Sequence, residues 1–356
     1  MGVGGDAGKG GSRMLSRLAA WLGMAEGVVL VGGGIFLALV VGSLARLVHL
    51  HRLPPETARS LLLRLRSWWV VVGVVGVGVL LGPAATVILM AGISLLALRE
   101  YVGLLPDPER ARIRDLRGWL IAVTILQYAW IELGSFLLFL AFIPVAGFLG
   151  LTLRVVLTRD PTDFRHLVGS LQWGLMLLVF NLSHVAWLLA MPESSNPVGG
   201  TIGWFLYLVI LTEFNDIAQA LWGRPFGRHK IIPEISPGKS WEGLLGALVC
   251  TAIVSSLLAP LLTPLAEPAP RLVGTPVGDW LAGLPLPAWP ILFAVGITIA
   301  GFCGDIVISA FKRDLHVKDS GTLLPGQGGI LDRIDSLTFT APLFLYLLLW
   351  LRGGGS

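Results

Sequence analysis

The residues best suited to chemistry lie between positions 304 and 335, in a polar stretch flanked by two long apolar runs. If the first run is helical, Asp305, Ser309 and Lys312 share one face, because they are spaced at i, i+4 and i+7. Asp332 and Asp335 open the second run, where negative charge suits the N-terminal end of a helix dipole. Two helices can therefore direct carboxylates toward a common point. Charge at a membrane boundary is costly and usually marks a functional site.

The same stretch adds positive charge and a glycine-rich turn at residues 325–329. Carboxylates surrounded by lysine and arginine suit a divalent cation that holds a polyphosphate. Interhelical ion pairing with ordinary basic loop residues would explain any one of these residues, but it explains the whole set poorly. The set comprises Asp305, Ser309, Lys312, Arg313, Lys318, Asp319, Gln327, Gly328, Gly329, Asp332, Arg333 and Asp335.

A second polar segment lies between residues 213 and 243 and ends in a basic turn that enters a helix. Backbone N–H groups at a helix start, one lysine and two hydroxyls form an anion-binding arrangement. The glycine spacing is not that of a Walker A loop. Taken alone, the turn is explained more simply by a helix cap with one ordinary lysine. Its residues are Ser236, Pro237, Gly238, Lys239 and Ser240.

The composition is that of an integral membrane protein. Of the 356 residues, 54% are hydrophobic and only 13% are charged, whereas soluble domains carry about 25% charged residues. We therefore predict an all-α, polytopic protein in a lipid bilayer. Aromatic and basic residues are not interleaved, so nucleic acid is not an expected partner. Cys250 and Cys303 both lie in apolar runs and support neither a disulfide framework nor a zinc site.

Ten apolar segments can be drawn, which predicts about nine to ten transmembrane helices. We divide the chain into a basic, Gly-rich N-terminal segment (1–25), N-terminal transmembrane helices (26–200), a C-terminal catalytic transmembrane region (201–351) and a tail (352–356). Residues 12–24 are an alternative candidate for an interfacial amphipathic helix. The segments are roughly 26–45, 68–82, 84–102, 118–132, 134–153, 167–191, 201–222, 242–264, 289–311 and 334–351.

The positions of the basic residues predict the orientation. Ten spans place all but five of the 26 Lys and Arg residues on one side of the membrane. By the positive-inside rule that side is cytoplasmic, so the active site would face the cytoplasm from the inner membrane. Tryptophans near the span ends are interpreted as interface anchors. They are Trp68, Trp69, Trp119, Trp222, Trp241, Trp289 and Trp350.

The stretch from Ser309 to Asp335 resembles the signature of CDP-diacylglycerol synthases, or phosphatidate cytidylyltransferases. It matches that signature at every specified position except Gln327, where the family has histidine. Ile217 likewise stands where the family has threonine in a second segment, so a divergent member is indicated. The resemblance covers about residues 213–351. In the second segment the similar positions are Asp216, Gly223-Arg224, Gly227 to Lys230 and Ser236 to Gly243.

The resemblance implies an Mg²⁺-dependent transfer of the cytidylyl group of CTP to phosphatidic acid, which yields CDP-diacylglycerol and pyrophosphate in phospholipid biosynthesis. Asp305 and Asp332 are expected to bind Mg²⁺, and a second cation is compatible with the site. The other expected catalytic residues are Lys312, Arg313, Lys318, Asp319, Arg333 and Asp335. The expected substrate contacts are Asp216, Ser236, Pro237, Gly238, Lys239, Ser240, Ser309, Gln327, Gly328 and Gly329.

Three other functions stay open from the sequence. One is a CTP-dependent transferase or kinase that acts on another membrane lipid. Another is an ion-coupled transporter, although no inverted repeat is found. The third is an inactive membrane scaffold, since Gln327 and Ile217 depart from the family pattern. The sequence also leaves a homodimer as an open alternative.

Overall fold

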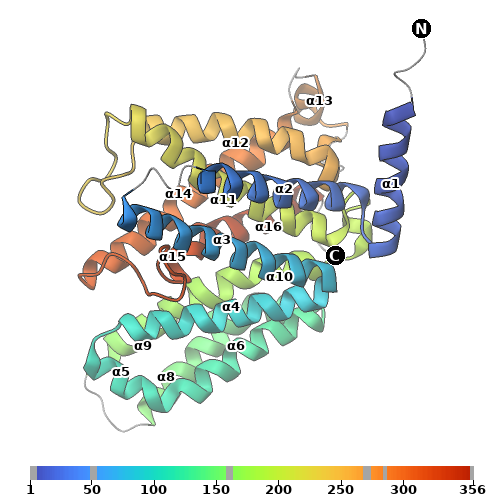
Figure 1. The fold of residues 1–356 in the computed structure, drawn as a ribbon. Helices are drawn as coiled ribbons and strands as arrows, with labels where there is room; N and C mark the ends of the chain where they lie inside the picture. The colour runs from blue at the N-terminus through green and yellow to red at the C-terminus, as the bar shows by residue number, and fades with distance from the viewer. Residues whose placement is uncertain (1–5, 49–53, 158–162, 268–273, 284–286, 353–356) are drawn as a thin grey trace.

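The computed structural model describes residues 6–48, 54–157, 163–267, 274–283 and 287–352. Within these ranges the chain forms helices and no strand, which confirms the all-α prediction. The long helices lie side by side in one bundle, parallel or antiparallel to one another (Figure 1). The first eight are α1 (Asp6–Leu22), α2 (Glu26–Val48), α3 (Pro55–Leu81), α4 (Pro83–Leu104), α5 (Asp107–Ile113), α6 (Arg117–Glu132), α7 (Phe136–Ala141) and α8 (Phe148–Val156).

The second half of the chain contains two of the three described 27-residue helices, α11 and α14, and α3 of the first half is the third. A π-helical segment joins α7 to α8 at Phe142–Gly147, and another joins α9 to α10 at Met176–Asn181. The helices are α9 (Phe164–Leu175), α10 (Leu182–Ala190), α11 (Gly200–Phe226), α12 (Trp241–Leu262), α13 (Pro276–Ala282), α14 (Ala288–Asp314), α15 (Leu331–Ile334) and α16 (Leu337–Arg352).

In the described ranges, nine helical spans are long and apolar enough to cross a membrane. They confirm nine of the ten expected spans. The remaining segment forms α6, whose 16 residues fall short of the roughly 20 that a hydrocarbon core requires. The nine are Glu26–Val48, Pro55–Leu81, Pro83–Leu104, Phe136–Val156, Phe164–Ala190, Gly200–Phe226, Trp241–Leu262, Ala288–Asp314 and Leu331–Arg352.

The start of α3 differs most from the sequence prediction. The apolar run was expected to begin at residue 68, but the helix begins at Pro55. Proline is favoured in the first turn of a helix because its missing N–H would have no intrahelical partner there. The added turns carry Arg59, Arg64 and Arg66, and a helix tolerates such charges where it leaves the apolar layer. This extension brings α3 alongside the polar stretch that the sequence singled out.

Burial differs strongly between spans. The span of α9 and α10 is the most enclosed, with 78% of its apolar window buried, whereas the corresponding value for α2 is 17%. A helix that is apolar on all sides must be covered either by protein or by lipid. The interior contains large rings, including the fully buried Trp204, Tyr207 and Phe344. The exposed aliphatic side chains of α2 and α3 therefore form a surface suited to contact with lipid tails.

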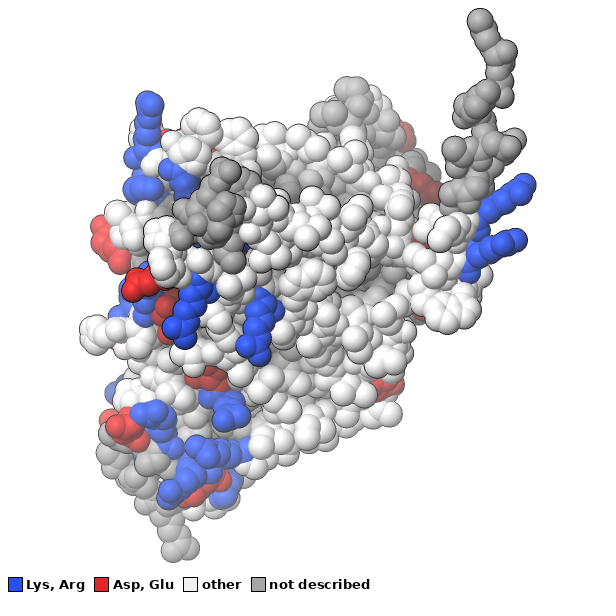
Figure 2. All heavy atoms as spheres, in the orientation of Figure 1, with Lys and Arg blue, Asp and Glu red and all other residues white. Residues whose placement is uncertain are grey.

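The two ends of the bundle differ in charge. Lys and Arg side chains gather at the end where α5 and the loops following α11 and α14 lie, and the surface between the two ends is largely uncharged (Figures 1 and 2). At the opposite end, α1 lies across the bundle (Figure 1) and exposes Met14, Leu18 and Trp21 beside Arg13 and Arg17. Such a helix fits the interfacial alternative proposed from the sequence.

Both polar segments lie at the basic end. One forms the loop between α11 and α12, and the other forms the loop between α14 and α15 (Figure 1). The two loops are in contact, because Arg313 donates from Nε to the carbonyl oxygen of Ile235 over 3.2 Å. The fold therefore places the two segments at one site, although residues 244–303 separate them in the chain.

Candidate active site

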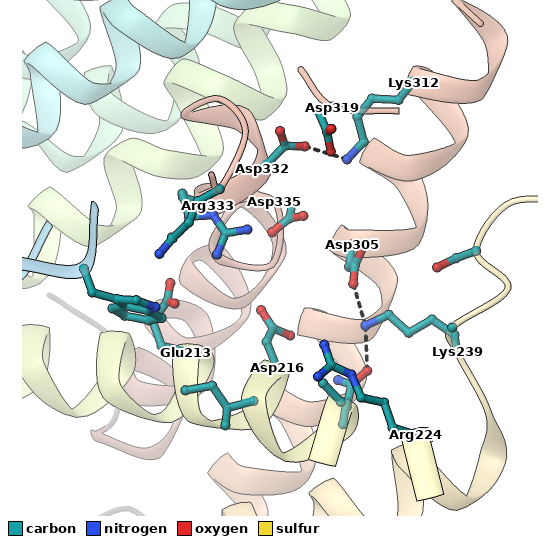
Figure 3. A pocket seen from close by; sticks show the side chains of 17 residues that line it. Glu213, Asp216, Arg224, Lys239, Asp305, Lys312, Asp319, Asp332, Arg333 and Asp335 are labelled. Atoms are coloured by element: carbon teal, nitrogen blue, oxygen red, sulfur yellow. Dashed lines mark hydrogen bonds and ion pairs between the residues drawn. The ribbon is translucent and has the colours of Figure 1, made fainter. Parts of the chain in front are cut away.

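A cavity of about 530 Å³ opens between α3, α11, α14 and α15 at the basic end of the bundle. Acidic and basic side chains line it from opposing elements, as Figure 3 shows. Eleven of the residues predicted to act in catalysis or to bind metal or substrate belong to the lining. They are Asp216, Ser236, Gly238, Lys239, Asp305, Lys312, Asp319, Gln327, Asp332, Arg333 and Asp335.

Asp305 joins the two segments. Its Oδ2 atom lies 2.5 Å from Nζ of Lys239, which comes from the loop between α11 and α12. Its Oδ1 atom accepts a hydrogen bond of 3.1 Å from the hydroxyl of Ser309, one turn later on α14. Lys239 also donates to Oε1 of Gln219 over 2.8 Å. The basic turn and α14 are thus linked by a charge-assisted contact inside the cavity (Figure 3).

Asp332 is held by the loop that precedes it. Its Oδ1 atom lies 2.6 Å from Nζ of Lys312. Its Oδ2 atom accepts hydrogen bonds from the backbone N–H groups of Ser320, at 2.9 Å, and Gly329, at 3.0 Å. Asp305 and Asp332 therefore line the same cavity, but each is paired with a different lysine (Figure 3).

Two further carboxylates face the cavity near Asp305. Figure 3 shows Asp335 and Asp216 pointing into the space between α14 and α11. The Oδ1 atom of Asp216 is buried and has no hydrogen-bond partner among the described residues. An unpaired buried carboxylate oxygen is costly unless a cation or a donor reaches it.

These carboxylates are of the ligand type that a divalent cation prefers, but they are not already arranged around a cation position. Across the described ranges, no group of three or more His, Cys, Asp or Glu residues is arranged to hold a metal ion. Mg²⁺ nevertheless prefers a few carboxylate oxygens together with substrate phosphates. Asp216, Asp305 and Asp335 supply such oxygens. The carboxylate of Asp305 is paired with the ammonium group of Lys239. The donor set therefore suits a cation that arrives together with a polyphosphate.

Several predicted site residues lie outside the cavity lining. Arg313 joins two loops through the carbonyls of Ile235 and Val317, and Lys318 and Pro237 are exposed. The buried Ser240 caps α12, because its hydroxyl accepts from the N–H of Gly243 over 3.2 Å. These contacts organise the loops around the cavity. The substrate and catalytic roles predicted for these four residues stay predictions.

The two glycines of the signature turn make room for carboxylates. Gly328 has φ +89°, and a Cβ atom there would lie 2.3 Å from Oδ2 of Asp332. A Cβ atom on Gly329 would lie 1.9 Å from Oε1 of Glu100, a residue of α4. Neither glycine lines the cavity. Substrate contact was expected at these positions and stays a prediction, and the groups that lie nearest to the two glycines are carboxylates of the protein itself.

Gln327, where the family signature has histidine, joins the loop to α3. Its Nε2 atom donates a hydrogen bond of 2.9 Å to the backbone carbonyl of Arg64. The neighbouring Pro325 carbonyl accepts a bond of 2.8 Å from the hydroxyl of Ser67, also on α3. A glutamine amide and a histidine ring N–H can both donate to a carbonyl. The substitution is therefore compatible with the hydrogen bond that docks this loop.

Other lining residues were not assigned to the site from the sequence. Glu213 and Arg224 lie on the same face of α11 as Asp216, because the spacing 213, 216, 220, 224 follows a helical repeat. That periodicity was a usable signal. Trp68 of α3 also lines the cavity, whereas the sequence favoured an interface anchor. Trp68 reaches the cavity because α3 packs near helices that are distant in the chain, and no local sequence pattern predicts that packing.

Comparison with known proteins identifies the family. Residues 62–351 match the cytidylyltransferase family. The chain belongs to this family. The matched range includes every residue that lines the cavity, from Trp68 to Asp335, so the resemblance noted for the C-terminal part extends over most of the chain.

Three relatives of this cytidylyltransferase-family chain differ in how much of the chain they match. The uncharacterized protein YnbB of Escherichia coli is 44% identical over 315 residues, which are 88% of this chain and 96% of that protein. A phosphatidate cytidylyltransferase of Haemophilus influenzae is 38% identical over 142 residues, 40% of this chain and 44% of its own length. The one from Staphylococcus haemolyticus is 38% identical over 146 residues, 41% of this chain and 49% of its own length. This chain thus aligns with less than half of the two named enzymes.

Proposed function

We propose that this protein transfers the cytidylyl group of CTP to phosphatidic acid, forming CDP-diacylglycerol and pyrophosphate with the help of Mg²⁺. One observation carries the proposal. The 2.5 Å contact between Lys239 and Asp305 joins the two signature segments within a single cavity at the end of a membrane helix bundle. Family membership supports nucleotidyl transfer, and the named relatives support phosphatidate as the acceptor.

The chemistry asks little of a general base. A non-bridging oxygen of the lipid phosphate attacks the α-phosphorus of CTP. The bond from that phosphorus to the oxygen bridging the β-phosphate breaks, and pyrophosphate leaves with the electron pair. Since a phosphate monoester is already anionic, the difficulty is to bring two negative reactants together and align them. Positive side chains placed around the two reactants meet this need.

The cavity supplies those charges from three directions. Lys239 and Arg224 approach from the α11–α12 side, Lys312 from α14 and Arg333 from α15 (Figure 3). We assign Lys239 to the nucleotide phosphates, because its turn lies at the N-terminal end of α12. Binding of the triphosphate would draw the Lys239 ammonium away from Asp305 and so release a carboxylate for the cation.

Mg²⁺ held there by Asp305, with Asp332, Asp335 and Asp216 nearby, would neutralise phosphate charge. Asp332 would bind the cation only if Lys312 turned away from it toward a phosphate, because Nζ of Lys312 now lies 2.6 Å from Oδ1 of Asp332. Arg333 and Lys312 would then contact pyrophosphate or the lipid phosphate. The predicted roles of Asp305 and Asp332 thus require that Lys239 and Lys312 leave these carboxylates and contact phosphate instead.

The orientation is part of the same proposal. The cavity lies at the end of the bundle where most Lys and Arg residues gather (Figure 2). The positive-inside rule favours the cytoplasmic side for that end. We therefore propose that the site faces the cytoplasm from the inner membrane, where CTP is available.

The experiment that tests the activity uses CTP carrying the label at one of two positions. Purified protein in mixed vesicles of phosphatidic acid and phosphatidylcholine is given Mg²⁺ and CTP labelled at the α- or the γ-phosphorus. We expect the α-label to enter the lipid fraction, with loss of the signal when phosphatidic acid is omitted. Entry of the γ-label instead would show lipid kinase chemistry and overturn the proposal. Entry of neither label would also overturn it.

A further inference from the structure

Glu100 of α4 contacts the signature loop although it belongs to neither signature segment. Its Oε1 atom accepts a hydrogen bond from the hydroxyl of Ser320 and one of 3.1 Å from the backbone N–H of Leu331. Its Oε2 atom accepts a bond of 3.0 Å from the N–H of Ile330. Both carboxylate oxygens are therefore used, and all three donors belong to the loop between α14 and α15 or to its junction with α15.

The carboxylate lies where a helix start needs an acceptor. The first N–H groups of a helix have no partner within the helix, and α15 begins at Leu331 with Ile330 preceding it. No side chain of the preceding residue caps this helix. Glu100 therefore supplies a cap from a distant part of the chain, 230 residues away from Ile330. A negative charge at this end of a helix is also electrostatically favourable.

The loop is shaped to receive this carboxylate. A Cβ atom on Gly329 would lie 1.9 Å from Oε1 of Glu100, and one on Gly321 would lie 3.0 Å from its Oε2. The first distance excludes any side chain at position 329 while Glu100 holds this place. Two glycines of the loop thus leave room for one side chain of α4.

Glu100 is linked to the cavity through one hydroxyl. Ser320 Oγ lies 2.9 Å from Oδ2 of Asp332 and also contacts Glu100. Asp332 in turn contacts Lys312 through its other oxygen, at 2.6 Å. A serine hydroxyl carries one proton, so it donates to one carboxylate at a time. The position of Glu100 therefore affects both the loop backbone and the hydrogen bonding of Asp332.

We propose that Glu100 is a positioning residue that holds the signature loop and, through it, the carboxylate of Asp332. It does not line the cavity, so it acts on the reaction through other residues. This inference depends on the proposed cytidylyl transfer only in that the turnover assay measures that reaction. The structural part concerns the loop alone and applies whichever lipid the protein acts upon.

The test compares Glu100→Gln with the wild-type protein in two measurements. Amide hydrogen exchange of the substrate-free protein reports on the loop, and we expect faster exchange in the peptide that contains Ile330 and Leu331. A glutamine keeps one oxygen but turns an NH₂ group toward a backbone donor, so one of the bonds is lost. Steady-state kinetics report on the reaction, and we expect kcat to fall by roughly 10- to 100-fold with little change in KM for CTP.

The matched control is Glu132→Gln, which removes one negative charge from an exposed position at the end of α6. It should alter neither measurement. Ser320→Ala, which removes the hydroxyl between the two carboxylates, should lower kcat in the same direction without a large change at Ile330 and Leu331. Size-exclusion profiles and thermal unfolding are compared for all variants, so that a folding defect is recognised.

Two results would overturn the inference. Unchanged exchange at residues 330 and 331 in a folded Glu100→Gln variant would show that Glu100 does not hold the loop. Faster exchange with wild-type kcat would show that holding the loop does not matter for catalysis. A failure of the proposed function is distinguishable from both, because it would appear as absent α-label transfer in the wild-type protein while the exchange result was unaffected.

Discussion

The two halves of the bundle contribute to the site in different ways. Among the residues that the structure describes, the C-terminal half, from α11 onward, provides every charged residue that lines the cavity, and the N-terminal half provides only Trp68. Yet the N-terminal half holds the signature loop from outside, through Ser67, the Arg64 carbonyl and Glu100. One half therefore supplies the charged lining of the cavity, and the other holds the loop that borders it.

The comparison teaches that a recognisable motif can depend on helices that carry no motif. The sequence of the N-terminal half is informative mainly in its hydropathy, because lipid-facing helices need only be apolar. Its polar contacts with the loop, within the described ranges, come from the hydroxyl of Ser67, the backbone carbonyl of Arg64 and the carboxylate of Glu100. Substitutions in the two halves should consequently differ in the kind of effect they have.

The largest effect is expected for Asp305→Asn, in the half that supplies the charged lining of the cavity. Loss of the carboxylate removes the proposed cation ligand and the partner of Lys239, so turnover with CTP and phosphatidic acid should fall by roughly 10²- to 10³-fold. Asp314→Asn, an exposed position at the end of the same helix, is the matched control and should be nearly silent. Wild-type turnover in Asp305→Asn would remove the cation assignment.

A smaller effect is expected for Lys239→Ala. The lysine is proposed to hold nucleotide phosphate, and a hydrogen bond to a charged group contributes about 1.5–3 kcal/mol. The value of kcat/KM for CTP should therefore drop by about 10- to 100-fold. Lys230→Ala, which removes an exposed lysine of the same loop outside the cavity lining, provides the comparison. Equal losses in both variants would mean that location in the cavity is unimportant.

In the half that holds the loop, Ser67→Ala should have a modest effect. It removes one neutral hydrogen bond of 2.8 Å to the Pro325 carbonyl, which contributes about 1 kcal/mol. We expect turnover to decrease by about fivefold. Ser60→Ala is the control on the same helix, because the hydroxyl of Ser60 bonds only locally, to the Thr57 carbonyl. A loss as large as that of Asp305→Asn would contradict the division of roles.

The smallest effect is expected for Gln327→His, which restores the residue typical of the family signature. Because an imidazole N–H can replace the amide as donor to the Arg64 carbonyl, turnover should stay within about threefold of wild type. Gln327→Leu removes the donor and should lower turnover by about as much as Ser67→Ala does. A large gain in Gln327→His would show that histidine does more than dock the loop.

Some predictions from the sequence hold at the level of architecture and family. The hydropathy pattern predicted a helical membrane protein, and nine spans are confirmed within the described ranges. The start of α3 was placed thirteen residues too late, because hydropathy detects only the apolar part of a helix that extends beyond the membrane. The resemblance carried by Ser309 to Asp335 is confirmed by family membership.

The residues assigned to the site were predictable where their spacing along one helix was regular. Asp305, Ser309 and Lys312 lie on one face of α14, spaced by about one helical turn. The cavity-lining residues of α11 show the same helical spacing. The geometry of Asp305 and Asp332 was not predictable, because each is paired with a lysine from another turn or helix. Ion pairs between distant segments depend on packing, about which spacing within a segment is uninformative.

The sequence by itself determined that the chain is helical, that it is built for a bilayer and that it resembles one enzyme family, because apolar run length and motif chemistry are local properties. Only the tertiary structure decided that Glu100 caps α15, that Gln327 docks on α3 and that Lys239 meets Asp305. These contacts join residues far apart in the chain, and they form only when helices are packed at fixed distances.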